Sequence, residues 1–216
     1  MKDGLIKFSL RWQRAPPPED IDALLQWRDR ISAAGLIGVQ PDGIGYGNIS
    51  VRAGSSFIIS GSGTGMHTTA RREHFTRVIH YDFPANSLLC RGPVQASSES
   101  LTHAAVYEAD ASAAAVVHVH HGELWRALLG KIPTTAKDVA YGTPEMAYEV
   151  LRLFRDTPVA DGGIFVMGGH EDGIVGFGGS LQEAATKLLA VLHAQCRMPV
   201  EVSAVPDLNA ESHRQG

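Results

Sequence analysis

Residues 115–120, AVVHVH, carry the pattern on which our interpretation of this chain depends. The stretch from Ala115 to Val119 is short, mostly apolar and rich in valine, which predicts a buried β-strand. Alternate side chains of a strand share a face, so His118 and His120 point the same way while Val117 and Val119 pack on the other face. The ring nitrogens of the two histidines can therefore reach one ion.

Two imidazoles do not make a catalytic metal site, because such sites take three or more protein ligands and keep an open position. The same pattern also fits two polar residues on a solvated strand face, and this segment alone leaves both interpretations open. Cupins use a His-x-His strand with a Glu four or five residues further on. Here Glu123 follows His120 by three residues, in a stretch (residues 122–129) that is typical of a helix, so we set a cupin aside.

Two further side chains favour a metal site. His170 follows the predicted strand Ile164–Met167 and two glycines, where its ring would be exposed to a ligand. Glu99 lies at the start of a helix predicted to begin near Ser97 or Ser98, and the helix dipole favours its ionised form. His103, one turn later, would orient Glu99 or simply pack. An ordinary loop histidine and an ordinary first-turn acid are the alternatives.

The composition agrees with a site built from imidazoles and carboxylates. The chain has 216 residues, 10 His, two Cys and 44% hydrophobic residues, which suits one globular domain. Cys90 and Cys196 exclude a disulfide framework and an all-cysteine zinc site, and we expect both to be reduced in a cytoplasmic protein. A net charge of −4 gives no basic surface for nucleic acid.

Basic side chains, including Lys2, Lys7 and Arg11, interrupt the N-terminal stretch, which therefore has no continuous apolar segment. We expect no signal peptide and no membrane partner. Residues 1–18 are predicted to form an N-terminal arm ending in three prolines, residues 19–205 one α/β domain with a mixed or antiparallel sheet, and residues 206–216 a polar tail. The elements that we expect are helices over 21–34, 97–108, 122–129, 143–156 and 180–196, a hairpin over 49–59, and strands over 78–81, 164–167, 173–177 and 199–205.

Three stretches of small polar residues supply hydroxyl, amide and backbone N–H groups that suit a phosphate. They contain neither a Walker A nor a Rossmann pattern, and each alone is equally typical of a hairpin turn. The stretches are Gly47–Ser50, Ser60–Gly65 and Ser97-Ser98.

Taken together and in order, these segments resemble the class II aldolase/adducin family. The order is GNIS at Gly47–Ser50, the Ser62-Gly63 loop, SSE at Ser97–Glu99, the His118–His120 strand and Gly-His at His170, and the resemblance spans residues 20–197. It implies a three-layer α/β/α sandwich with a mixed, mainly antiparallel central sheet. It also implies a homotetramer with its active sites at the subunit interfaces.

The resemblance further implies the roles of individual residues. His118, His120 and His170 would bind a divalent metal ion, zinc first, with Mn, Co or Ni as alternatives. Glu99 would be the catalytic acid and base. The remaining matched positions would bind the phosphate of a small-molecule substrate: Asn48, Ser62, Gly63, Ser97 and Ser98.

The implied activity is that of a lyase of the aldolase type, which acts on a small, phosphorylated hydroxy-carbonyl compound through a metal-stabilised enediolate. An epimerase, isomerase or dehydratase at the same metal site is an alternative, and so is a non-catalytic adducin-like interaction module. The chain departs from the aldolase pattern where a catalytic Tyr follows an Ile-Pro pair, because Ile132-Pro133 is followed there by Lys137. The replacement is open among Lys137, Tyr141, Glu171 and Asp172.

Overall fold

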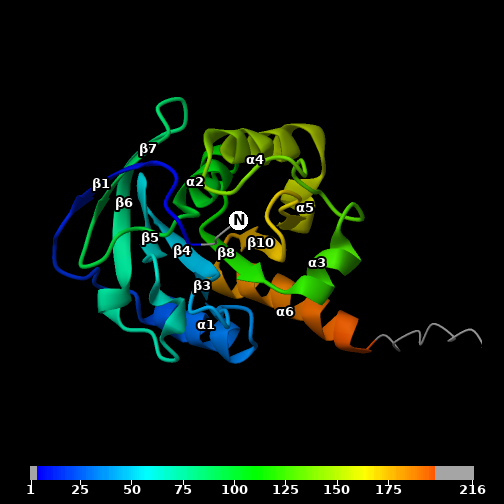
Figure 1. Cartoon of the computed structure of the whole chain (residues 1–216), viewed down its shortest axis with the longest axis horizontal. Helices are drawn as coiled ribbons and strands as arrows, with labels where there is room; N and C mark the ends of the chain where they lie inside the picture. Colours follow the sequence, from blue (N-terminus) through cyan, green and yellow to red (C-terminus); the bar gives the residue numbers. More distant parts are fainter. Residues whose placement is uncertain (1–3, 198–216) are drawn as a thin grey trace, which may run out of the picture.

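The strand that carries His118 and His120 lies in the middle of the molecule. In the computed structural model, which describes residues 4–197, β8 (Ala115–His120) belongs to an eight-stranded sheet, and all six of its residues are buried. Its neighbours on both sides are antiparallel, β4 (Asn48–Ala53) and β10 (Gly173–Gly178). Helices cover both faces of the sheet, which is why this strand is buried at every position (Figure 1).

The sheet has the strand order β1-β7-β6-β5-β4-β8-β10-β9, and β1 with β7 is the parallel pair in it. The fold is thus α/β with a mixed, mostly antiparallel sheet, as predicted. Besides β4, β8 and β10, the strands of this sheet are β1 (Ser9–Gln13), β5 (Ser56–Ser60), β6 (Phe75–Asp82), β7 (Ser87–Arg91) and β9 (Ile164–Val166). A separate pair is formed by β2 (Gly38–Val39) and β3 (Gly45–Tyr46).

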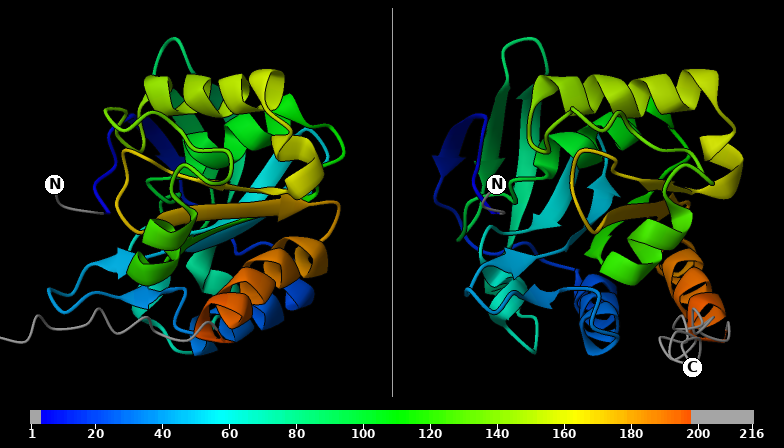
Figure 2. Two further views of the ribbon diagram at one scale, coloured as in Figure 1. Left: turned by 90° about the vertical axis from the view of Figure 1, so that its right-hand side faces the viewer. Right: turned by 45° about the vertical axis from the view of Figure 1, so that its right-hand side comes forward.

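Helices pack on both faces of the sheet and complete the predicted α/β/α sandwich (Figure 2). On one face, α2 (Ser100–Ala109) and α4 (Pro144–Asp156) enclose a core that includes Phe165 and Phe177. On the other face, α1 (Asp22–Ala33) and α6 (Leu181–Arg197) enclose a second core. The shorter helices are α3 (Gly122–Leu128), α5 (Val159–Gly162), η1 (Thr64–Met66) and η2 (Arg72–His74).

The long helices begin where the sequence predicts caps. The hydroxyl of Thr143 accepts a hydrogen bond from the N–H of Met146, with Pro144 in the first turn of α4. Ser180 accepts in the same way from the N–H of Glu183 at the start of α6. Helix α2 begins at Ser100, later than predicted, because residues 97–99 form a turn before it.

The predicted hairpin over 49–59 is confirmed as the antiparallel pair of β4 and β5. The edge strand β1 was not predicted. Residues 9–13 were assigned to an arm, but they pair with β7 along their whole length. The predicted strand over 199–205 and the polar tail lie outside the described residues, and the predicted domain boundaries stay predictions.

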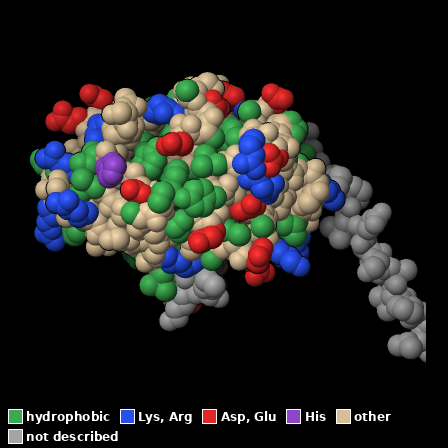
Figure 3. All heavy atoms as spheres, turned by 90° about the horizontal axis from the view of Figure 1, so that it is seen from above, with side chains coloured by type: hydrophobic (Ala, Val, Ile, Leu, Met, Phe, Trp, Pro, Cys, Tyr) green, Lys and Arg blue, Asp and Glu red, His purple; other side chains and the backbone are tan. Residues whose placement is uncertain are grey.

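Helix α4 leaves part of its outer face in contact with solvent. Figure 3 shows hydrophobic side chains gathered in the middle of this side of the molecule, with charged side chains around them. Tyr148 of α4 is 47% exposed.

None of the helices within residues 4–197 combines the length and the hydropathy that crossing a bilayer requires.

Candidate metal centre

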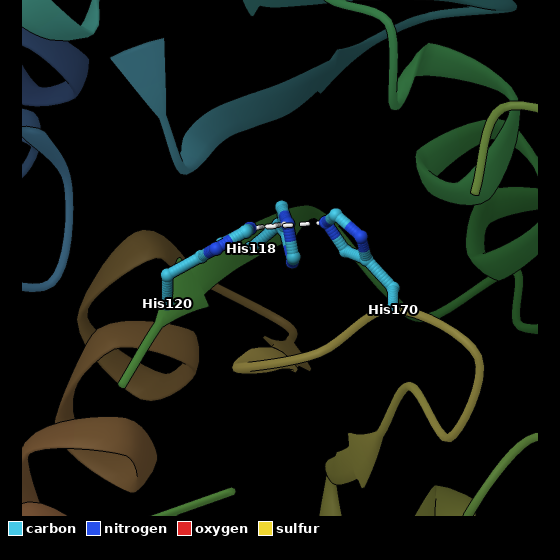
Figure 4. Close-up of side chains that lie close together, drawn as sticks. All are labelled: His118, His120 and His170. Atoms are coloured by element: carbon cyan, nitrogen blue, oxygen red, sulfur yellow. Dashed lines mark hydrogen bonds between the residues drawn. The ribbon is translucent and has the colours of Figure 1, made fainter. Parts of the chain in front are cut away.

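Three histidine rings converge beside the sheet. The Nε2 atom of His120 lies 3.0 Å from the Nε2 atom of His118 and 3.0 Å from that of His170. Figure 4 shows the three rings pointing toward one another, two from β8 and one from the loop before β10. All three side chains are at least nine-tenths buried. The predicted ligands are therefore brought together, although His170 is 50 positions from His120 in the sequence.

A tight turn between β9 and β10 places His170. The N–H of Met167 donates to the carbonyl of Gly173 at 2.9 Å, and the N–H of Gly173 donates to the carbonyl of His170 at 3.0 Å. A Cβ atom at Gly173 would lie 2.7 Å from Cδ2 of His170 and 3.2 Å from Cε1 of His118. Residue 173 is a glycine because two imidazole rings pack directly against its backbone.

Burial keeps the three rings neutral. It lowers the pKa of His118 and of His170 well below the usual range, and nearby histidines lower both further. Burial also lowers the pKa of His120 to about 4. Neutral imidazole is the form that binds metal, so at pH 7 the cluster has the protonation state that a divalent cation requires.

The arrangement fits a divalent cation. The Nδ1 atom of His118 lies 3.3 Å from the carbonyl oxygen of Ile174, which can only accept, so Nδ1 carries the proton and the lone pair of Nε2 faces the cluster. A tetrahedral zinc site with Zn–N bonds of about 2.0–2.1 Å has ligand atoms about 3.3 Å apart. The Nε2 spacings of 3.0 Å from His120 to His118 and from His120 to His170 are close to that value. The donor set of three imidazoles is that of an open catalytic site.

Glu99 lies beside this cluster. Its Oε1 atom is 3.5 Å from Nε2 of His170, and its Oε2 atom accepts a hydrogen bond from the hydroxyl of Thr102 at 3.0 Å. His103 packs instead of orienting this carboxylate, because its Nδ1 atom bonds the hydroxyl of Ser50 at 2.7 Å. Thr102, which the sequence did not single out, helps to hold Glu99.

A cavity of about 30 Å³ opens in front of the histidines and Glu99. All five residues that the sequence predicted as phosphate ligands line it. The side-chain oxygen of Asn48 is buried there and accepts no hydrogen bond from any described residue. The full lining is Gly4, Gly45, Tyr46, Gly47, Asn48, Gly61, Ser62, Gly63, Gly65, Ser97, Ser98, Glu99, His118, His120 and His170.

The loop with Ser62 and Gly63 is held from behind by a buried cation. Arg28 of α1 is 3% exposed, and its Nη2 atom donates to the carbonyl oxygens of Thr64 at 3.1 Å and Gly65 at 3.3 Å. Its Nη1 atom lies 3.3 Å from Oδ1 of Asp29. This contact could not be predicted from the sequence, because it joins positions 36 and 37 residues apart that belong to no common motif.

The four suggested replacements for the absent tyrosine differ in position. Tyr141 is 2% exposed, and its ring centroid lies 4.6 Å from that of His170. Lys137 and Glu171 are exposed, and Asp172 has a buried Oδ1 atom without a hydrogen-bond partner among the described residues. Tyr141 thus packs against a histidine of the cluster. Sequence reasoning also missed Lys7, whose ammonium group lies over the Tyr141 ring.

Comparisons with known proteins agree with this geometry. The family model of the class II aldolase and adducin N-terminal domain matches residues 42–200. No curated protein matches the sequence.

Several solved structures share the fold. L-fuculose-1-phosphate aldolase from Thermus thermophilus superposes with a TM-score of 0.58 at 23% identity, over 81% of this chain and 89% of that one. A sugar-phosphate aldolase from Thermotoga maritima gives 0.61 at 14% identity, over 81% and 91%. YgbL from Klebsiella pneumoniae superposes with a TM-score of 0.61 at 17% identity, over 88% of this chain and 93% of that one.

Proposed function

We propose, from the premise that this chain belongs to the class II aldolase and adducin N-terminal domain family, that it is a divalent-metal-dependent lyase of the aldolase type. Its substrate would be a small, phosphorylated hydroxy-carbonyl compound. The observation that carries the proposal is the convergence of three buried Nε2 atoms with the carboxylate of Glu99 at one cavity. A scaffold protein has no use for such a ligand set.

His118, His120 and His170 would hold the metal ion, and zinc is the ion that this donor set suits first. A bound divalent cation supplies Lewis acidity toward the carbonyl and hydroxyl oxygens of a substrate. The protein fixes the donor atoms in advance, because β8 and the turn before Gly173 orient all three rings. Little reorganisation is then required when a ligand binds.

Glu99 is placed to move a proton. Thr102 donates to Oε2, and Oε1 lies on the side of the carboxylate nearest His170. An ionised carboxylate in this position can accept a proton from a carbon or a hydroxyl group of a substrate in the cavity and return it later. Thr102 would set the orientation of Glu99 without touching the substrate.

The other end of the cavity would bind the phosphate group. Its donors are hydroxyl, amide and backbone N–H groups, and α2 begins there with its dipole favouring an anion. The side-chain oxygen of Asn48, which is buried without a donor among the described residues, indicates a polar ligand. Binding energy from a phosphate that does not react would hold the reacting carbons near the histidines.

A metal analysis followed by one substitution tests this proposal. Purified protein should contain about one equivalent of Zn, Mn, Co or Ni per chain. Glu99→Gln should retain the metal and lose about 10²- to 10⁴-fold in kcat on a panel of phosphorylated and unphosphorylated aldols, because proton transfer is removed. Full activity in Glu99→Gln would remove Glu99 from its role. Wild-type protein that refuses metal at neutral pH would contradict the enzyme proposal itself.

An epimerase, isomerase or dehydratase at the same site is the second candidate. It is favoured by the exposed Lys137 at the position where aldolases of this family have a tyrosine. The same panel separates the candidates, because a lyase releases an aldehyde and a smaller carbonyl compound, whereas an isomerase conserves the carbon count.

We also propose a cytoplasmic homotetramer with its active sites at the subunit interfaces. Two observations support burial of the cavity mouth in an assembly. Leu5 is 59% exposed and Met66 is 55% exposed, and each is adjacent to a glycine that lines the cavity. Light scattering coupled to size exclusion tests the assembly, and a monomeric mass of about 23 kDa would contradict it.

A further inference from the structure

The chain contributes to its cavity a segment that lies outside the residues matched by the family model. That match begins at residue 42, yet Gly4 lines the cavity. A Cβ atom at Gly4 would lie 3.2 Å from the side chain of Ile44 and 3.9 Å from the carbonyl oxygen of Gly45. The segment Gly4–Phe8, which we call the entry strap, therefore forms part of the wall.

The entry strap is fixed in place by Asn86, at the end of the β6–β7 hairpin. The side chain of Asn86 donates to the carbonyl of Lys7 at 3.0 Å, and its own carbonyl accepts from the N–H of Ser9 at 2.8 Å. Phe8 is 6% exposed and packs in the core beneath α2 and α4. The backbone on both sides of Lys7 is thus anchored.

The anchored backbone directs Lys7 toward the metal centre. Its Nζ atom donates to the carbonyl oxygen of Tyr141 at 3.1 Å and lies 3.4 Å from the centroid of the Tyr141 ring. That ring is 4.6 Å from the His170 ring. The Lys7 stem passes Gly142, where a Cβ atom would lie 2.9 Å from the carbonyl oxygen of Ser98. Tyr141 thus separates Lys7 from His170, and Gly142 separates it from Ser98 of the cavity lining.

The charge of Lys7 has no purpose in binding a metal cation. A positive charge near His170 repels a cation at the cluster and attracts an anion in the adjoining cavity. None of the described residues that line the cavity is Lys or Arg, and its one carboxylate, Glu99, is negative. An anionic ligand would therefore gain from positive charge behind the wall, which Arg28 supplies at the loop with Ser62 and Gly63, and Lys7 on the side of Tyr141.

We propose that Lys7 is a positioning residue that clamps the entry strap onto Tyr141 and supplies positive charge for an anionic group of the substrate, of the phosphate class. This inference rests on the proposed function of the same cavity. It assigns to residues outside the family match a part in binding the substrate.

The test uses the full chain loaded with Co²⁺, with inorganic phosphate as the probe. Lys7→Gln keeps a donor for the Tyr141 carbonyl and removes the charge, Lys7→Arg keeps both, and the exposed Lys131→Gln is the matched control. Two constants are measured: the Kd for Co²⁺ by chelator competition, and the Kd for phosphate from the Co²⁺ absorption spectrum. Thermal unfolding is recorded for each variant, and Lys7→Met serves as a second neutral variant.

Lys7→Gln should weaken phosphate binding by about three- to tenfold, the order expected for one unit charge at several ångströms in a partly solvated site. Its affinity for Co²⁺ should stay unchanged or increase. Lys7→Arg and Lys131→Gln should bind phosphate within about twofold of wild type, since each leaves the charge at position 7. Weaker binding of phosphate together with an unchanged or increased affinity for Co²⁺ would indicate a charge effect.

Several results would overturn the inference. Unchanged phosphate binding in Lys7→Gln and Lys7→Met would remove the charge role, and an equal loss of Co²⁺ and phosphate affinity would reduce Lys7 to a packing residue. Wild-type protein that binds Co²⁺ and no phosphate would also contradict it. Wild-type protein that binds no Co²⁺ contradicts the proposed function instead, and calorimetry with phosphate on the metal-free protein then still decides the role of Lys7.

Discussion

The two ends of the cavity are built by different means. At the histidine end, β8 holds two rings, and its pairing partners across the sheet fix their height and direction: His118 pairs with Asn48 and Val175, and His120 with Gly173. At the loop end, Ser62 and Gly63 lie between β5 and η1, where Gly63 has a φ of 73°. The strand end is set by sheet register, and the loop end by turns and by one buried arginine.

The two ends suit two different functions, which are binding of a metal ion and binding of a substrate. Metal ligands need donor atoms fixed to within a fraction of an ångström, and strands in a sheet centre provide that. Substrate-binding loops tolerate changes in sequence and length, so relatives with one metal site can act on different compounds. We therefore expect changes at the histidine end to abolish binding of metal, and changes at the loop end to alter affinity for substrate.

The largest effect is expected at the strand end. His120→Ala removes the ring whose Nε2 atom contacts both other histidines, so its affinity for Zn²⁺ should fall at least about 100-fold, leaving two ligands. The matched control is His121→Ala, at the next position, whose ring accepts from the N–H of Leu124 at the start of α3. That control should lose only about 1 kcal/mol of stability and keep its metal. Chelator competition measures both, and metal retention in His120→Ala would disprove the ligand assignment.

A smaller effect, with the metal kept, is expected at the loop end. Arg28→Met removes both hydrogen bonds to the loop carbonyls, so the loop should loosen and KM should rise about tenfold or more, with the Kd for metal unchanged. Arg30→Met is the control, because Arg30 is exposed on the same helix and lies over the Trp27 ring. Equal KM values in the two variants would show that the loop does not depend on Arg28.

The smallest effect near neutral pH concerns His103, which is fully buried and bonds the hydroxyl of Ser50 on β4. Burial lowers its pKa to about 3, below the value of about 6.5 in an unfolded chain. The unfolded chain then binds one more proton between these two pKa values. The contribution of His103 to the free energy of unfolding is therefore fully present above pH 6.5 and decreases as the pH falls. Urea unfolding of metal-free protein from pH 7 to 4 measures this slope. His103→Gln should reduce it by about 1.4 kcal/mol per pH unit, and an unchanged slope would contradict the burial argument.

The sequence predicted residues at both ends of the cavity, but it did not predict the contacts that hold these residues in place. The alternation in AVVHVH, the glycines before His170 and the caps of α4 and α6 are local patterns, and a local pattern survives folding unchanged. The order of these motifs indicated the family, and the resemblance to the family implied the mixed, mainly antiparallel sheet. Edge strand β1 was missed because it pairs with β7, more than 70 positions away.

Lys7 and Arg28, which the sequence missed, share this nonlocal character, whereas the missed Thr102 lies only three positions from Glu99. Thr102 was overlooked beside the more conspicuous His103, whose partner turned out to be Ser50 on β4. Lys7 contacts Tyr141 across 134 positions, and Arg28 contacts a loop that follows four further strands. No spacing rule connects such pairs, because their proximity is a consequence of the completed fold.

A crystal of the metal-loaded protein, measured on both sides of the zinc absorption edge, tests the central claim most directly. We predict one anomalous peak per chain, about 2.0–2.1 Å from the Nε2 atoms of His118, His120 and His170, with Glu99 beside it. A peak bound by other side chains, or a zinc-soaked crystal with no peak among these three rings, would contradict the account.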